Sequence, residues 1–88
     1  MSIKIKLNLP LQRLANNREK IEATGFTVKE CLYDLVRQIP GSKSELFDEE
    51  GSFSLLILLN NEPLPEQNLS YCLKDGDELW LLSIVSGG

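Results

Sequence analysis

Histidine is absent from the 88-residue sequence, and Cys31 and Cys72 are its only cysteines. The sequence therefore offers almost no side chains for zinc ligation or histidine-based catalysis. The two cysteines do not form a C-x-x-C pair, and free cysteine is among the most frequently buried residues. We therefore predict two small buried thiols and no metal site.

Long apolar runs are also absent. No stretch approaches the roughly 18 apolar residues that span a membrane. The opening "MSIKIKLNLP" alternates apolar and basic residues and lacks the long apolar block of a secretory signal. At this length the chain has room for one small domain. We predict a cytoplasmic protein without membrane attachment.

Basic residues are scarce in the second half of the sequence. Eight of the nine Lys and Arg residues precede position 45, together with four acidic residues, whereas the remainder carries nine acidic residues and only Lys74. The net charge of −4 and the lack of a basic stripe with interleaved aromatic residues argue against nucleic-acid binding. A basic or mixed-charge protein partner fits this charge balance better.

The side chains of a self-contained enzyme are missing as well. The acidic run at residues 48–50 is typical of a solvated loop, and "KDGDEL" (74–79) is typical of a tight turn rather than a calcium loop. No nucleophile stands out together with a base. We predict that the protein is not an enzyme.

The apolar periodicity predicts four strands and one main helix. Strands are predicted over residues 2–9, 18–26, 53–61 and 78–85. Thr27 and Glu30 have the spacing of a capping box, and the apolar stripe after them predicts an amphipathic helix up to Ile39.

One helix covers only one face of a sheet, so these elements predict a two-layer α+β domain. Their order is that of a ubiquitin-like β-grasp, with a mixed four- to five-stranded sheet and the first and last strands side by side at its centre. We expect this domain over residues 1–83 and a flexible C-terminal tail over residues 84–88.

Two strands carry more apolar residues than a half-buried sheet requires. Successive residues of a strand point to opposite faces of the sheet. If one set faces the helix, the other set points away from it and includes Leu56, Leu58, Trp80 and Leu82. The same alternation places Lys4, Lys6 and Asn8 on that outer face. Either a loop or a second short strand covers the four apolar side chains, or they form a docking surface. We favour the docking surface, because an indole at its centre suits a binding hot spot.

The sequence closes on Gly87–Gly88, a pair that contributes no side chain to a core. Two glycines at these positions arise by chance in roughly 0.5% of chains, at an average glycine usage of about 7%. A tail without side chains can thread a narrow channel and present its α-carboxylate inside another protein. Because a carboxylate is a poor electrophile, an enzyme must first activate it, for instance as an acyl-adenylate with ATP.

A family resemblance becomes specific at this end. "LKDGDELWLLSIVSGG" (73–88) resembles the closing motif of the MoaD/ThiS-type sulfur carriers, the family of the molybdopterin synthase small subunit and the thiamine sulfur carrier. "LILLNNEPL" resembles the family's strand ending in Asn, and "TVKECLYDL" resembles its Thr-Val-x-x-Leu helix start. The similarity extends over nearly the whole chain and implies a β-grasp sulfur-carrier protein.

The resemblance also implies roles for the last residues. Gly88 is the glycine that is adenylated and then converted to a thiocarboxylate, and Gly87 is the threading glycine before it. Val85 and Ser86 belong to the tail that a partner binds, and Leu82 matches a docking position usually filled by an aromatic residue.

The sequence departs from the family pattern at two places. Molybdopterin-type members commonly have Pro-Pro where this sequence has Ser83–Ile84, which makes the base of the tail less stiff. Asn8 stands where the family often has an aromatic residue. The first departure leaves open which pathway the carrier serves, and the second weakens that part of the docking surface.

The expected partner is an adenylating, ubiquitin-activating-like enzyme, which uses ATP and Mg²⁺ while the carrier binds no cofactor itself. A molybdopterin synthase large subunit is a further partner that the resemblance suggests. The "VSGG" ending favours the molybdopterin branch, and thiamine or another sulfur-containing product stays open. Also open are a ubiquitin-like modifier joined to lysines through Gly88 and a plain interaction domain with an inert tail.

Overall fold

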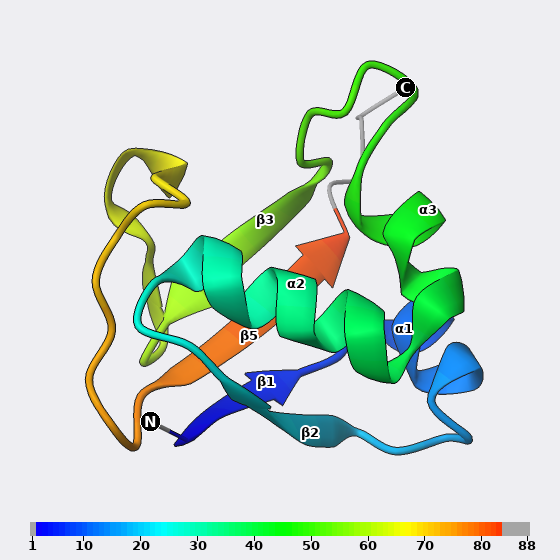
Figure 1. Ribbon diagram of the computed structural model, residues 1–88, viewed down its shortest axis with the longest axis horizontal. Helices are drawn as coiled ribbons and strands as arrows, with labels where there is room; N and C mark the ends of the chain where they lie inside the picture. Colours follow the sequence, from blue (N-terminus) through cyan, green and yellow to red (C-terminus); the bar gives the residue numbers. More distant parts are fainter. Residues whose placement is uncertain (1, 84–88) are drawn as a thin grey trace.

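The computed structural model describes residues 2–83, which form a five-stranded sheet with short helices packed against it (Figure 1). In chain order the elements are β1 (Ser2–Lys6), α1 (Leu9–Leu14), β2 (Lys20–Thr24), α2 (Val28–Gln38), η1 (Pro40–Ser42), α3 (Lys43–Leu46), β3 (Leu55–Leu59), β4 (Glu62–Pro63), η2 (Pro65–Gln67) and β5 (Glu78–Ser83). None of the helices in this part of the chain is long and apolar enough to cross a membrane.

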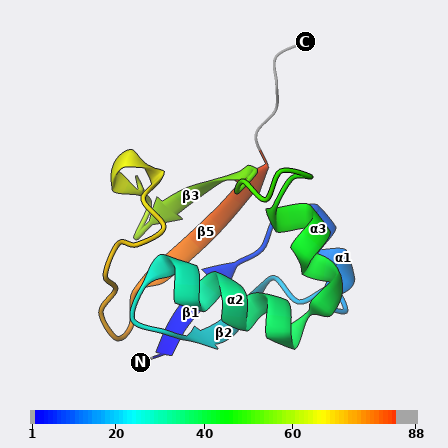
Figure 2. The same ribbon diagram turned by 45° about the horizontal axis from the view of Figure 1, so that its top comes forward.

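The first and last strands lie side by side within the sheet. The strand order is β2-β1-β5-β3-β4. β1 and β5 run parallel, with Ile5 opposite Leu79, and the other neighbouring strands run antiparallel. Helix α2 crosses one face of the sheet, as Figures 1 and 2 show. The predicted ubiquitin-like β-grasp is therefore confirmed, with five strands.

The core lies between α2 and one face of the sheet. Its strand residues come from alternating positions, and its helix residues come from one stripe. The fully or almost fully buried members from these elements include Ile3, Ile5, Ile57, Leu79 and Leu81 from the strands and Val28, Cys31, Leu32 and Leu35 from α2. Burial of one such side chain stabilises the fold by roughly 1.5–3 kcal/mol, so this layer is the main source of stability.

The first strand is shorter than the predicted strand over residues 2–9. It ends at Lys6 because Asn8 forms the N-cap of α1, where its Oδ1 accepts a hydrogen bond from the Leu11 N–H at 3.0 Å. Pro10 then lies in the first helical turn, where its missing N–H costs no hydrogen bond. The prediction that Asn8 belongs to the outer row of a strand is therefore wrong.

Helix α2 begins at its predicted N-cap, where the Thr27 Oγ1 accepts a hydrogen bond from the Glu30 N–H at 3.2 Å. The returning half of the capping box reaches one residue further back, because the Glu30 Oε1 accepts from the Phe26 N–H at 2.6 Å. Gly25 allows this tight entry, since a Cβ there would lie 2.8 Å from the Glu30 Cβ.

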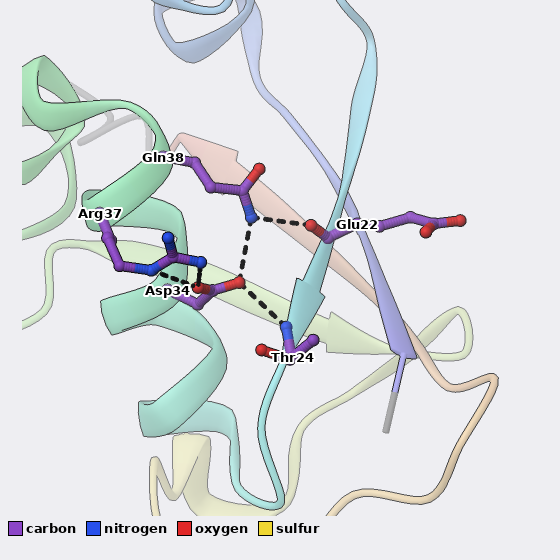
Figure 3. A network of polar contacts seen from close by, with 5 residues as sticks. All are labelled: Glu22, Thr24, Asp34, Arg37 and Gln38. Carbon is purple, nitrogen blue, oxygen red and sulfur yellow. Dashed lines mark hydrogen bonds and ion pairs between the residues drawn. The ribbon is translucent and has the colours of Figure 1, made fainter.

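A carboxylate on α2 ties the helix to the edge strand β2 (Figure 3). The Asp34 Oδ2 accepts hydrogen bonds from the Thr24 N–H and from the Gln38 Nε2, each at 3.0 Å. The Asp34 Oδ1 accepts from Arg37, and the Gln38 Nε2 also donates to the Glu22 carbonyl at 2.8 Å. Burial raises the pKa of Asp34, but the hydrogen bonds from Thr24, Arg37 and Gln38 outweigh it and hold that pKa below its ordinary value.

Removal of this carboxylate in Asp34→Asn is expected to lower the free energy of unfolding by about 1–2 kcal/mol at neutral pH, because an amide cannot accept from both the strand and Arg37. The folded pKa is lower than the unfolded one. The stabilisation is therefore present above the unfolded pKa of about 4 and is lost as the pH falls through the folded pKa. Urea unfolding at neutral and acidic pH measures the difference between variant and wild type, which should shrink in acid.

Glu22→Gln is the matched control, because Glu22 contributes its backbone carbonyl to the network while its carboxylate points away from it (Figure 3). An equal loss of stability in the two variants would contradict the role of the Asp34 carboxylate.

Candidate functional site

Four apolar side chains from β3 and β5 form a patch on the face of the sheet that α2 does not cover. Leu56 lies opposite Leu82, and Leu58 lies opposite Trp80. The three leucines are half-buried and Trp80 is 37% exposed. The short strand β4 extends the sheet sideways, with Pro63 beside Leu58, and does not lie over the patch. We call Leu56, Leu58, Trp80 and Leu82 the outer patch.

A lysine from β1 borders the outer patch. Lys6 lies beside Trp80 in the parallel register, and its Nζ lies 5.0 Å from the centre of the indole ring. The same Nζ forms an ion pair with the Glu78 Oε1 at 3.3 Å. Both interactions are partly exposed, so each contributes about 1 kcal/mol or less. Together they hold the lysine against the ring and position it at the edge of the patch.

Further basic residues continue this border along β1 and β2. Lys20 is the register partner of Lys6, and Lys4 is the partner of Glu22. Like charges directly opposite each other in a sheet are destabilising, so the Lys6–Lys20 pair does not support the fold. A hollow of about 280 Å³ lies here, and its lining consists of Lys4, Arg18, Lys20, Ile21 and Glu22. The outer patch thus has a predominantly basic flank on its β1–β2 side.

The last strand ends next to the cap of the first helix. Ser83 closes β5 opposite Leu55 of β3, and the Asn8 Nδ2 donates a hydrogen bond to the Ser83 Oγ at 2.8 Å. The tail residues that the sequence analysis selected lie outside the described residues: Val85, Ser86, Gly87 and Gly88, together with Ile84.

The two cysteines differ in their surroundings. Cys31 is fully buried, and burial, followed by the nearby Asp34 and Glu30 carboxylates, raises the pKa of its thiol to about 11. Cys72 is exposed, so the prediction of a second buried thiol is wrong. Its segment pairs with the start of α2 through a bridge to Thr27, and the neighbouring Leu73 is the residue that enters the core.

The acidic residues near β5 stabilise a turn. The Asp75 Oδ1 accepts a hydrogen bond from the Ser2 N–H, and the Asp77 Oδ2 accepts from the Lys74 N–H, both at 2.8 Å. The predicted turn is thus confirmed. Between residues 2 and 83, no three His, Cys, Asp or Glu side chains come together as possible metal ligands.

Comparison with known proteins places this chain in a family. Residues 5–88, nearly the whole chain, match the ThiS family. The chain belongs to the ThiS family. No curated protein sequence matches it.

Solved structures similar to this ThiS-family protein share its fold over its full length. SAMP1 from Haloferax volcanii has a TM-score of 0.84 at 29% identity, covering 100% of both chains. A chain of the Amycolatopsis orientalis BexX/CysO complex has a TM-score of 0.82 at 28% identity, covering 98% of this chain and 99% of that one. A chain of the complex of subunits 1 and 2 of the Helicobacter pylori molybdopterin-converting factor has a TM-score of 0.63 at 26% identity, covering 100% of both.

These findings confirm the resemblance to MoaD/ThiS-type, ubiquitin-like carriers. The ThiS-family chain has the fold of a small sulfur carrier or ubiquitin-like modifier. Two of the three structures above contain a second protein, so a protein is the kind of partner that this fold binds.

The cysteines of this ThiS-family protein should differ in reactivity. We expect a water-soluble disulfide reagent to modify Cys72 rapidly in the native protein, because the thiol is exposed. Cys31 should react only on the time scale of unfolding, because it is buried and its pKa is raised. Release of the coloured thiolate over time, with and without denaturant, measures both rates. Cys72→Ser should remove the fast phase alone, and a fast phase that persists in this variant would contradict the assignment.

Proposed function

We propose that the protein is a sulfur carrier whose Gly88 carboxylate is adenylated by an activating enzyme and converted to a thiocarboxylate. The thiocarboxylate then donates its sulfur in cofactor biosynthesis, with molybdopterin as the favoured product. The observation that carries the proposal is the match to the ThiS family, which extends through Gly87 and Gly88.

The chemistry requires a partner enzyme at two steps. In the first, the Gly88 carboxylate attacks the α-phosphorus of ATP, and pyrophosphate leaves with Mg²⁺. In the second, hydrosulfide attacks the acyl-adenylate carbonyl, AMP leaves, and the carboxylate oxygen that was bound to AMP is replaced by sulfur. The carrier supplies the carboxylate and the docking surface and is not itself an enzyme. ATP and Mg²⁺ belong to the partner, and we assign the reaction to the cytoplasm, where both are abundant.

The outer patch is the surface that we assign to docking. An exposed indole among half-buried leucines offers a large apolar area with few rotatable bonds, as binding hot spots do. Lys4, Lys6 and Lys20 flank it, so a partner with an apolar centre and acidic residues on one side would complement it.

A synthase large subunit is a second partner that we propose for the same surface. The Helicobacter pylori structure contains subunit 1 of the molybdopterin-converting factor with subunit 2, which supports such an assembly. The Amycolatopsis orientalis structure contains CysO with BexX, so the fold also serves other partners. For this reason we keep thiamine or another sulfur-containing product as the alternative acceptor.

The alternative function is a ubiquitin-like modifier joined to lysines through Gly88. The similarity to SAMP1 over the full length of both chains favours it, since SAMP1 is a small archaeal modifier protein. Activation is chemically the same, and only the final nucleophile differs. Lysine-linked conjugates that disappear when Gly88 is deleted would support the modifier over the sulfur carrier.

Intact-mass measurement tests the carrier function directly. After incubation with the cognate adenylating enzyme, ATP, Mg²⁺ and a sulfide donor, we expect a mass gain that corresponds to the replacement of one oxygen by sulfur. Deletion of Gly88 should abolish the gain, and omission of ATP is the second control. An unchanged mass with an enzyme that activates this carrier would refute the proposal.

Truncation of the exposed indole tests the docking surface. Trp80→Ala should raise the KM of the activating enzyme for the carrier about 30-fold, the effect of a hot spot that contributes ~2 kcal/mol. Tyr33→Ala is the matched control, because Tyr33 is an exposed aromatic residue on α2, which packs against the other face of the sheet. A KM for Trp80→Ala within about twofold of the control would exclude the outer patch as the docking surface.

A further inference from the structure

One asparagine side chain joins the beginning of the domain to the end of its last strand. The Asn8 Oδ1 accepts a hydrogen bond from the Leu11 N–H at 3.0 Å, which fixes the carbonyl end of the side-chain amide on the helix. The Nδ2 at the other end therefore faces Ser83 and donates to its Oγ at 2.8 Å.

The backbone around Asn8 is held from several sides. The Leu7 N–H donates to the Glu19 carbonyl at 2.9 Å, and the Leu7 side chain is buried. The Gln12 Nε2 donates to the Leu7 carbonyl at 2.9 Å, and the Gln12 N–H donates to the Asn8 carbonyl at the same distance. Asn8 is therefore a rigid support, because neither its backbone nor its side chain can rotate without loss of these bonds.

Ser83 needs such a support on one side. Toward β3, the ladder continues to the strand end, where Ser83 lies opposite Leu55. Toward β1, the register pairs of the described strands stop at Lys6 and Trp80. Beyond these register pairs, the Asn8 side chain supplies a hydrogen bond from the β1 side at the end of β5.

We propose that Asn8 is a positioning residue that clamps Ser83 and so sets the direction in which the chain leaves β5 for the catalytic centre of the partner. This inference rests on the proposed carrier function. Strand alternation places Ser83 on the same side of β5 as the buried Leu81, whereas Trp80 and Leu82 face the outer patch. The clamp therefore affects presentation of the Gly88 carboxylate and leaves the docking surface unchanged.

Two substitutions remove the clamp while each keeps the helix cap. Ser83→Ala deletes the acceptor, and Asn8→Ser retains a capping oxygen but is too short to reach Ser83. Both should lower the kcat for thiocarboxylate formation about fivefold, the change that ~1 kcal/mol of a lost hydrogen bond produces, with little change in KM. The double variant should be no slower than either single one, because all three lack the same bond. Ser83→Thr keeps the hydroxyl and should restore kcat.

Ser70→Ala is the control, because Ser70 is exposed and its recorded hydrogen bond uses its backbone N–H, not its hydroxyl. An unchanged kcat in Ser83→Ala, or a raised KM at constant kcat, would overturn the positioning role. In the second case the pair would serve docking instead.

A measurement on the carrier alone separates the clamp from the proposed function. In NMR relaxation experiments, the backbone order parameter at position 83 should fall in Ser83→Ala and Asn8→Ser. It should stay at the wild-type value in Ser83→Thr. Failure of the wild-type protein to be activated would refute the carrier function and leave this readout intact. An order parameter that does not change in the first two variants would refute the clamp itself.

Discussion

The strands β1 and β5 come from opposite ends of the described chain, and their parallel pairing places Ile5 opposite Leu79 near the centre of the sheet. A parallel pair requires a long connection, and here nearly the whole domain forms it, including α2 on one face of the sheet. Once the two strands are in register, Lys6 lies against Trp80 and Asn8 lies within hydrogen-bond distance of Ser83. The edge of the outer patch and the support for the end of β5 are consequences of this one pairing.

Successive side chains along each strand point to opposite faces of the sheet, so the two faces carry different residues. In β5, Leu79 and Leu81 enter the core, while Trp80 and Leu82 remain on the outer face. The same six-residue strand therefore supplies both packing energy and the surface that we propose for docking. Asp34 of α2 secures the covered face by accepting a hydrogen bond from the Thr24 backbone N–H of β2, while Lys20 of β2 contributes to the basic flank. Packing of the covered face and formation of the outer surface therefore depend on different side chains.

Sequence reasoning succeeded where one strong period decides the structure. The alternation in β1, β3 and β5 and the stripe of α2 identified the core residues of these elements and the members of the outer patch, and the capping box located the start of α2. It failed where two local preferences compete or where distant segments meet. Asn8 continued an alternating pattern but was also a good N-cap residue. The hydrogen bond that its side chain accepts from the Leu11 N–H places it at the start of the helix. Cys72 is exposed in a segment that pairs with the distant Thr27, and the Asn8–Ser83 bond joins residues 75 positions apart.

The division between faces is also compatible with the low sequence identity among structures of this fold. SAMP1, the BexX/CysO complex and the molybdopterin-converting factor share this architecture at 26–29% identity, so most side chains can change while the inner face still packs. The outer-patch residues are not part of this buried core, so substitutions there change the exposed surface of the sheet and leave the inner face packed. Within β5, Trp80 and Ser83 lie three residues apart and point to opposite sides. Docking and presentation, as proposed above, therefore depend on side chains from opposite sides of the same strand.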